Sequence, residues 1–203
     1  PVASSSSELF VGTFETDNEN FIRDWGAGDG EANAVVQQDG ELHIQPTWGS
    51  SDTNIAIARD NQSDQFLDLA QPFTISVDVF VPAEYESEAL EMQFFVKDSA
   101  WNFAAVGYFG DADIQLGQVQ TLSFEMEDLS TYDGYKQEGF MAEGAPNSFG
   151  LEIKGITAAK TEAIRLDNFT LTVPGSEETL ETVVDLNFSD ASEADSFTVD
   201  YFE

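Results

Sequence analysis

The sequence contains no cysteine and few basic residues. Without cysteine the fold has no disulfides, so a hydrophobic core, with or without a bound metal, must hold it together. Seven lysines and arginines stand against 39 aspartates and glutamates, which gives a formal net charge of −32. A field of this sign repels the phosphates of nucleic acids and of anionic lipid surfaces. We therefore expect neither a nucleic acid nor a membrane as partner, and no run of residues is apolar enough to span a bilayer.

Motifs of catalysis are also missing. The single histidine, His43, has no nucleophile motif of the G-x-S-x-G type to serve, so a catalytic triad is unsupported. No EF-hand loop is present, and zinc is disfavoured without cysteine. Paired carboxylates can hydrolyse glycosides, but among 39 acidic residues their spacing does not discriminate. We expect the chain not to be an enzyme.

The acidic excess itself has three interpretations. A salt-rich habitat would screen the self-repulsion and reward a hydrated carboxylate surface, whereas bound divalent cations or a cationic partner would neutralise part of the charge. The first two are compatible with each other, and the sequence leaves all three open. The 41% of hydrophobic residues, with 17 phenylalanines among them, nevertheless predicts a folded protein rather than a disordered one.

Apolar and polar residues alternate with a period of two in many short runs. Each run places its apolar side chains on one face, as the layers of a two-sheet sandwich require. We therefore predict an all-β fold, a sandwich of two antiparallel sheets, with an irregular excursion at 127–139. The predicted strands lie at 34–38, 41–45, 54–58, 73–79, 90–97, 120–126, 149–155 and 163–173.

The alternation changes phase at Asp167 and Asn168. Ile164 and Leu166 share one parity, whereas Phe169 and the apolar residues after it take the other. A β-bulge returns a strand to the core side after such a slip, and bulges redirect side chains. The sequence therefore predicts a bulge here that positions the Asp167 carboxylate.

The chain divides into three segments. Residues 1–8 are predicted to be a Ser-rich linker, residues 9–174 a β-sandwich module, and residues 175–203 an acidic hinge with a strand-forming tail. The tail repeats the pattern of the N-terminal segment: a strand ending in Phe, an acidic turn, a second Phe and a closing aromatic. It is either the start of a second copy of the module, which we favour, or a final hairpin of the same domain.

The order of short phrases along the chain resembles a known family. The phrases are FETDNENF, DGELHI, TWGSSDTNIAI, FTISVDVFVP, LEMQFFVKDSAW, QTLSFEM, FGLEIKG and IRLDNFTLTV, which together cover residues 9–173. They resemble the calcium-stabilised jelly-roll carbohydrate-binding modules of polysaccharide-degrading enzymes, of the mannan-, xylan- or β-glucan-binding types. The resemblance implies a secreted, extracellular chain with a jelly-roll β-sandwich, aromatic platforms for sugar rings and a Ca²⁺ ion that ties the first strand to the last.

The three tryptophans are the candidate platforms. Trp25, Trp48 and Trp101 all lie in loop-like contexts, and a sugar ring presents an apolar face that stacks on indole while its hydroxyl groups need polar partners. Burial in a core is the alternative for any one of them, and Trp25 is also suited to cover the edge of the sandwich. The predicted ligand-binding residues are Trp25, Trp48, Trp101, Arg59, Glu91, Gln93, Lys97 and Asn102, of which Glu91, Gln93 and Lys97 share one face of a strand.

The predicted metal ligands follow from the same resemblance. Calcium takes six to eight oxygen ligands from carboxylates and carbonyls. Glu15, Asp17 and Asp167 match the family's ligand positions, and a backbone carbonyl near Glu41 is expected to complete the set.

Two functions remain open from the sequence, and a hydrolase or lyase in its own right is a third possibility that we disfavour. In the first, the chain is a non-catalytic module of a secreted multidomain enzyme and binds a β-linked polysaccharide through its tryptophans. In the second, it is a structural repeat or subunit of an extracellular adhesin or filament, and the tail at 176–203 mediates self-association by donating a strand to a neighbouring copy.

Overall fold

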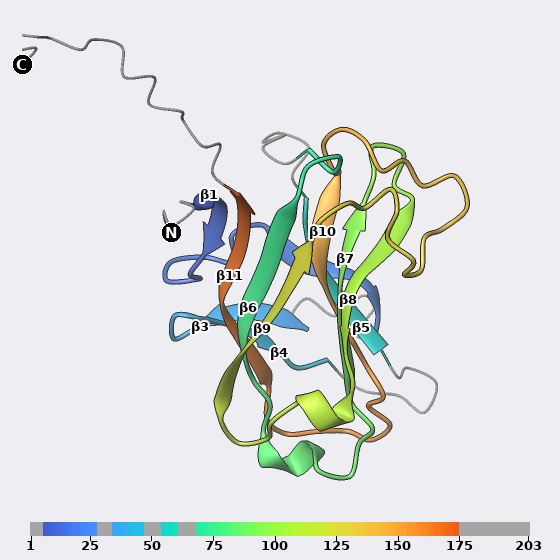
Figure 1. The fold of residues 1–203 in the computed structure, drawn as a ribbon. Helices are drawn as coiled ribbons and strands as arrows, with labels where there is room; N and C mark the ends of the chain where they lie inside the picture. Colours follow the sequence, from blue (N-terminus) through green and yellow to red (C-terminus); the bar gives the residue numbers. More distant parts are fainter. Residues whose placement is uncertain (1–5, 28–33, 47–53, 61–67, 175–203) are drawn as a thin grey trace, which may run out of the picture.

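The computed structural model describes residues 6–27, 34–46, 54–60 and 68–174, and in these segments the chain folds into two β-sheets (Figure 1). Every pairing between the named strands is antiparallel. The described helical segments are two short 3₁₀ turns, η1 (Ala83–Tyr85) and η2 (Asp111–Asp113). The predicted all-β sandwich of two antiparallel sheets is confirmed, and none of the described helices is long and apolar enough to cross a membrane.

One sheet has six strands. Its order is β3-β4-β11-β6-β9, and β1 also pairs with β11. The strands are β1 (Ser6–Gly12), β3 (Val35–Gln38), β4 (Glu41–Ile44), β6 (Phe73–Phe80), β9 (Val119–Met126) and β11 (Ile164–Pro174). Figure 1 shows β1 beside the last part of β11, so the first and last described strands lie next to each other.

The other sheet has five strands in the order β2-β5-β10-β7-β8. They are β2 (Phe21–Gly26), β5 (Asn54–Asp60), β7 (Glu91–Lys97), β8 (Phe103–Phe109) and β10 (Ser148–Lys154). Because β10 is central and pairs with both β5 and β7, its outward side chains stand in the middle of this face.

The core between the sheets is rich in phenylalanine. Burial along β6 alternates strictly, with its first residue, Phe73, inside. Rings from both sheets meet there: Phe21 lies 4.9 Å from Phe169 between centroids, and both side chains are fully buried. Aromatic rings of this size bury a large apolar area each, so this cluster stabilises the sandwich without disulfides.

The predicted bulge is present in β11. The register against β6 shifts between Asp167 and Thr170, and Asn168 has a φ of 47°. On the opposite edge of β11, Leu166 still pairs with β4, whereas Phe169 pairs with β1. The bulge therefore lies where the long strand changes from one partner to another.

Strand β8, like β2, is an element that the alternation does not predict. Ala104, Ala105 and Val106 are buried in succession, so the strand has no polar face to reveal it. A loop segment covers its free edge: Ala105 N–H donates to the carbonyl of Tyr135 at 2.9 Å, and Gln137 N–H donates to the carbonyl of Phe103 at 2.8 Å. The period-two signal is lost for another reason: both faces of β8 carry apolar side chains, Ala104 and Val106 on the inner face and Phe103 and Ala105 on the outer one.

The predicted segment boundaries are only partly within the described residues. Strand β1 begins at Ser6, inside the stretch predicted to be linker, and β11 ends at Pro174. Residues 1–5 and 175–203 lie outside the described residues, so the repeat or donated strand expected in the tail remains a prediction.

Candidate functional site

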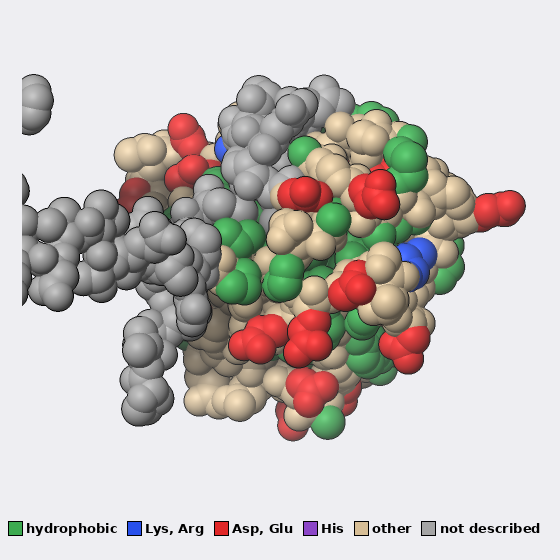
Figure 2. Space-filling view, turned by 45° about the horizontal axis from the view of Figure 1, so that its top comes forward, with side chains coloured by type: hydrophobic (Ala, Val, Ile, Leu, Met, Phe, Trp, Pro, Cys, Tyr) green, Lys and Arg blue, Asp and Glu red, His purple; other side chains and the backbone are tan. Residues whose placement is uncertain are grey.

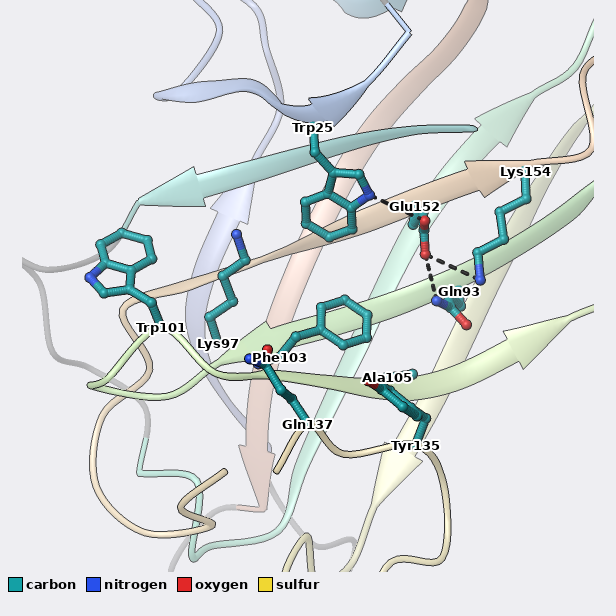
Figure 3. A pocket seen from close by; sticks show the side chains of 10 residues that line it. All are labelled: Trp25, Gln93, Lys97, Trp101, Phe103, Ala105, Tyr135, Gln137, Glu152 and Lys154. Atoms are coloured by element: carbon teal, nitrogen blue, oxygen red, sulfur yellow. Dashed lines mark hydrogen bonds and ion pairs between the residues drawn. The ribbon is translucent and has the colours of Figure 1, made fainter. Parts of the chain in front are cut away.

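The outer face of the five-stranded sheet carries a hollow of about 640 Å³ (Figure 3). Strands β2, β7, β8 and β10 contribute to it, together with the β7–β8 turn and the loop before β10. The lining side chains are Trp25, Gln93, Lys97, Trp101, Phe103, Ala105, Tyr135, Gln137, Glu152 and Lys154. We call this set the outer groove.

An aromatic layer forms the floor of the outer groove. Phe95 is fully buried and lies 4.8 Å from Trp25 and 5.4 Å from Phe103 between ring centroids. The neighbouring outward positions of β5 hold only Ala56 and Ala58, which pack into the same cluster. Trp25 and Phe103 of this cluster line the outer groove, so the apolar part of its floor is aromatic.

Glu152 is the polar centre of the outer groove. Its residue is only 6% exposed. One carboxylate oxygen accepts from Trp25 Nε1 at 3.3 Å and from Asn54 Nδ2 at 2.9 Å. The other accepts from Gln93 Nε2 at 2.6 Å and lies 3.3 Å from Lys154 Nζ.

The four donors around Glu152 come from four adjacent strands and fix each other's orientation. Since Nε2 of Gln93 and Nδ2 of Asn54 both donate to the carboxylate, the orientation of each amide is set. The indole of Trp25 is held in the same way through Nε1. The groove is therefore organised before any ligand arrives, which lowers the entropic cost of binding.

Lys97 occupies the space between the two tryptophans of the outer groove. Its Nζ lies 4.9 Å from the Trp25 ring centre and 5.8 Å from that of Trp101, and it forms a 2.5 Å ion pair with Asp24. Figure 3 shows Trp101 at one end of the groove, with Lys97 between it and Trp25. The ammonium group thus lies between the indole rings of Trp25 and Trp101, and each indole keeps a face on which a ligand ring can stack.

Trp101 is held in position by the turn between β7 and β8. Its side chain is 46% exposed and its backbone has a φ of 67°. The fully buried Asp98 organises the turn, because its carboxylate accepts backbone N–H groups from Ala100, Asn102 and Met141, each at 2.8 Å. Burial by itself raises the pKa of Asp98, but these hydrogen bonds outweigh it and hold the pKa below its usual value.

Tyr135 and Gln137 form the wall on the β8 side. Tyr135 is 65% exposed and its ring lies 6.0 Å from Phe103. The Gln137 side chain accepts from Phe103 N–H at 3.2 Å. Because this loop segment is bonded to β8 through its backbone, the tyrosine ring stands on a fixed support.

The structure brings four of the predicted ligand-binding residues together: Trp25, Trp101, Gln93 and Lys97 all line the outer groove. Trp25 lies on β2 and not in a loop as its sequence context indicated. Trp48 lies outside the described residues.

Three other predicted residues do not line the groove. Arg59 is separated from it, because this residue shares the inward parity of Ile57: its guanidinium lies 4.5 Å from the Phe10 ring centre, and its Nε donates to the Glu19 carbonyl. Asn102 is engaged with Asp98 and with the carbonyl of Gly139. Glu91 shares the outward face of Gln93 but lies beyond the lining residues, where it contacts Tyr108.

Sequence reasoning missed Phe103, Tyr135, Gln137, Glu152 and Lys154. Parity could have found two of them, since Glu152 and Lys154 alternate with the inward Leu151 and Ile153. No sequence signal indicates Tyr135 or Gln137, because the loop that carries them is irregular.

The predicted metal ligands are partly gathered beside β11. Burial raises the pKa of Asp167 above its usual value, and repulsion by the carboxylates of Glu41, Asp78 and Glu15 raises it further. Glu41 is also paired with Arg165 at 2.8 Å. This mutual repulsion is of the kind that a cation would relieve.

Asp17 stands apart from that set, in an exposed turn where it accepts the Glu19 N–H at 2.7 Å. Within the described residues, no group of three or more acidic, histidine or cysteine side chains lies close enough to hold a metal ion. The side chains as placed therefore do not close around calcium, and the ion remains a prediction.

No family model and no curated protein matches the sequence. Solved structures do match the fold. The Caldicellulosiruptor saccharolyticus module CBM27-1 in complex with mannohexaose superposes with a TM-score of 0.55 and 12% identity, over 86% of this chain and 100% of that one.

Two further matches are similar in extent. The CBM22-1 xylan-binding domain of Paenibacillus barcinonensis Xyn10C gives a TM-score of 0.52 at 14% identity, over 86% of this chain and 99% of that one. The CBM22-1–GH10 modules of Clostridium thermocellum endo-1,4-β-D-xylanase 10B, complexed with xylohexaose, give 0.53 at 15% identity, over 85% of this chain but only 29% of that longer chain. The chain therefore has the fold of carbohydrate-binding modules, as its sequence resemblance implied.

Proposed function

We propose that this chain binds a β-linked polysaccharide, without catalysis, as a module of a secreted glycan-degrading enzyme. The observation that carries the proposal is the outer groove. In it the rings of Trp25, Trp101 and Tyr135 lie around the polar side chains of Gln93, Glu152 and Lys154. A sugar ring is apolar on its faces and polar around its edge, so it requires both kinds of surface at once.

The groove meets these two needs with different residues. The exposed rings of Trp101 and Tyr135 offer stacking surfaces at different sides of the hollow. Gln93 and Lys154 stand on adjacent strands of the floor and offer hydrogen-bonding groups to hydroxyls. The groove is open to solvent, which suits a site that takes the side of a long chain and not a small molecule enclosed in a cavity.

The fold supports the same proposal. The matching structures include modules bound to xylohexaose and mannohexaose, so the fold is compatible with binding either type of chain. Secretion and attachment to an enzyme are parts of the proposal that rest on this similarity. A structural calcium beside Asp167 is a separate proposal, supported by the repulsion among the carboxylates there.

The test is calorimetry and affinity electrophoresis against mannan, xylan and β-glucan. We expect binding to at least one, and Trp101→Ala should weaken it by at least about tenfold, which corresponds to about 1.4 kcal/mol. Val119→Ala is the matched control, since Val119 is 62% exposed but lies on β9 of the other sheet. Absence of binding to all three polysaccharides, or equal loss in both variants, would overturn the proposal.

A further inference from the structure

Resting on the proposed function, we infer that the outer groove selects uncharged polysaccharide chains and rejects chains that carry carboxylates. The inference comes from the placement of the few cations in this acidic chain. It names the chemical class of the ligand, which the groove's aromatic rings alone do not.

The described residues contain all seven lysines and arginines of the chain. Outside the groove, the Lys160 ammonium is paired with Glu88 at 2.6 Å and the Arg165 guanidinium with Glu41 at 2.8 Å. Arg59 and Arg23 lie elsewhere, and each has interactions of its own. None of these four cations lines the groove.

Both cations that line the outer groove already have a carboxylate partner. Lys97 is paired with Asp24 at 2.5 Å and is largely buried, with a side chain 14% exposed. Lys154 lies 3.3 Å from the buried Glu152. The formal charges of these four side chains cancel, so the lining offers hydrogen-bond donors without a net positive charge.

The loop that supplies Tyr135 to the groove wall is acidic, in a chain with a formal net charge of −32. The loop that carries Tyr135 exposes five carboxylates, and its one cation, Lys136, donates to the backbone carbonyls of Leu129 and Ser130. The five are Glu127, Asp128, Asp133, Glu138 and Glu143. Figure 2 shows acidic side chains spread over the surface on the side it presents, with few basic ones among them.

These charges act differently on the two classes of chain. An acidic surface does not repel a neutral chain, but it repels a chain that carries carboxylates. Once in the groove, such a chain also meets no lysine that lacks a carboxylate partner. Salt weakens that repulsion, because the screening length falls from about 10 Å at 0.1 M to about 3 Å at 1 M.

Matched pairs of polymers test the inference. Mannan is compared with polymannuronate, xylan with glucuronoxylan, and cello-oligosaccharides with oligoglucuronate, by calorimetry at pH 7 in about 0.05 M and about 1 M NaCl. In whichever pair binds, we expect the neutral polymer to bind at least about tenfold more tightly than the carboxylated one in low salt. The ratio of the two affinities should be smaller in high salt.

A preference for the carboxylated member, or affinity for it that falls as salt rises, would overturn the inference and leave the proposed function intact. Absence of binding to every polymer would instead remove the proposed function itself, and the inference with it. The two failures are therefore distinct.

A variant locates the effect in the groove. Asp24→Asn leaves the Lys97 ammonium without its carboxylate partner. We expect the low-salt ratio between neutral and carboxylated chains to fall by about threefold or more. Glu125→Gln is the matched control, since it removes the same charge from an exposed position on β9 of the other sheet. An equal change in both variants would show that only net charge matters and would overturn the assignment to Lys97.

Discussion

The outward faces of the two sheets differ although both sheets share one core. On the six-stranded sheet most outward positions of β6 and β11 are polar, and the hydroxyls of Ser76 and Thr170 hydrogen-bond to each other at 2.6 Å. On the five-stranded sheet the outward positions hold Trp25, Phe95 and Phe103 in mutual contact. The first face is mainly polar, whereas the second presents aromatic rings together with amide groups.

The same contrast appears in one aspartate near each face. Hydrogen bonds hold the pKa of Asp98, beside the outer groove, below its usual value despite the effect of burial. Burial and neighbouring carboxylates raise the pKa of Asp167, on the six-stranded sheet. The charge of Asp98 is stabilised by the fold, while that of Asp167 is destabilised by it.

Removing the Trp25 ring should cause the largest loss of glycan affinity, and so should show the difference between the two faces most clearly. We expect Trp25→Ala to weaken glycan binding by at least about 30-fold, or about 2 kcal/mol, because the ring both lines the groove and packs on Phe95. Calorimetry measures the affinity, and Trp25→Phe is the second variant, since it keeps a ring but removes the Nε1–H donor to Glu152. Phe80→Ala, on the other sheet, should leave binding unchanged. Equal losses for Trp25→Ala and Phe80→Ala would contradict the difference between the faces.

Glu152→Gln should cause the next largest loss of glycan affinity. A glutamine presents one oxygen where the carboxylate presents two, so at least one of its four donors loses its acceptor. We expect the free energy of unfolding to fall by about 1–2 kcal/mol and glycan affinity by about tenfold. Denaturant unfolding and calorimetry measure the two effects. Wild-type affinity in this variant would mean that the groove does not depend on the Glu152 contacts.

Asp98→Asn should release the turn that carries Trp101. A group whose pKa is lower in the folded state stabilises the fold above its unfolded pKa of about 4, and this contribution is lost as pH falls toward the folded value. We expect the variant to lose about 2 kcal/mol at pH 7 and to show a flatter decrease of stability below about pH 4. Thermal unfolding measured from about pH 2 to about pH 7 reports both the loss of stability and its pH dependence. An unchanged acid profile would show that the Asp98 carboxylate is not the group responsible.

The smallest effect is expected on the six-stranded sheet. If calcium binds beside Asp167, the ion relieves the repulsion from Glu41 and Glu15, and the melting temperature should rise by about 2–5 °C in excess Ca²⁺ over EDTA. Asp167→Asn should lose this shift, while Glu125→Gln should retain it. Absence of any shift in the wild-type protein would exclude the proposed calcium at this place.

The sequence predicted the fold better than it predicted the site. Alternation identified β6, β9 and β11 because each has one buried and one exposed face, and the phase change at Asp167 identified the bulge. Alternation did not identify strand β8 because both of its faces carry apolar side chains. Arg59 was misplaced although its parity with Ile57 already directs it inward.

The amino-acid order by itself determined which side chains of each strand face the core, since a strand alternates its side chains whatever its neighbours are. It also determined the acidic excess and the lack of disulfides. Only the tertiary structure decided that Trp25, Gln93 and Glu152 share one groove, because strand order brings distant segments together. It likewise decided that Tyr135 completes the wall, because pairing with β8 is a long-range contact that no local pattern encodes.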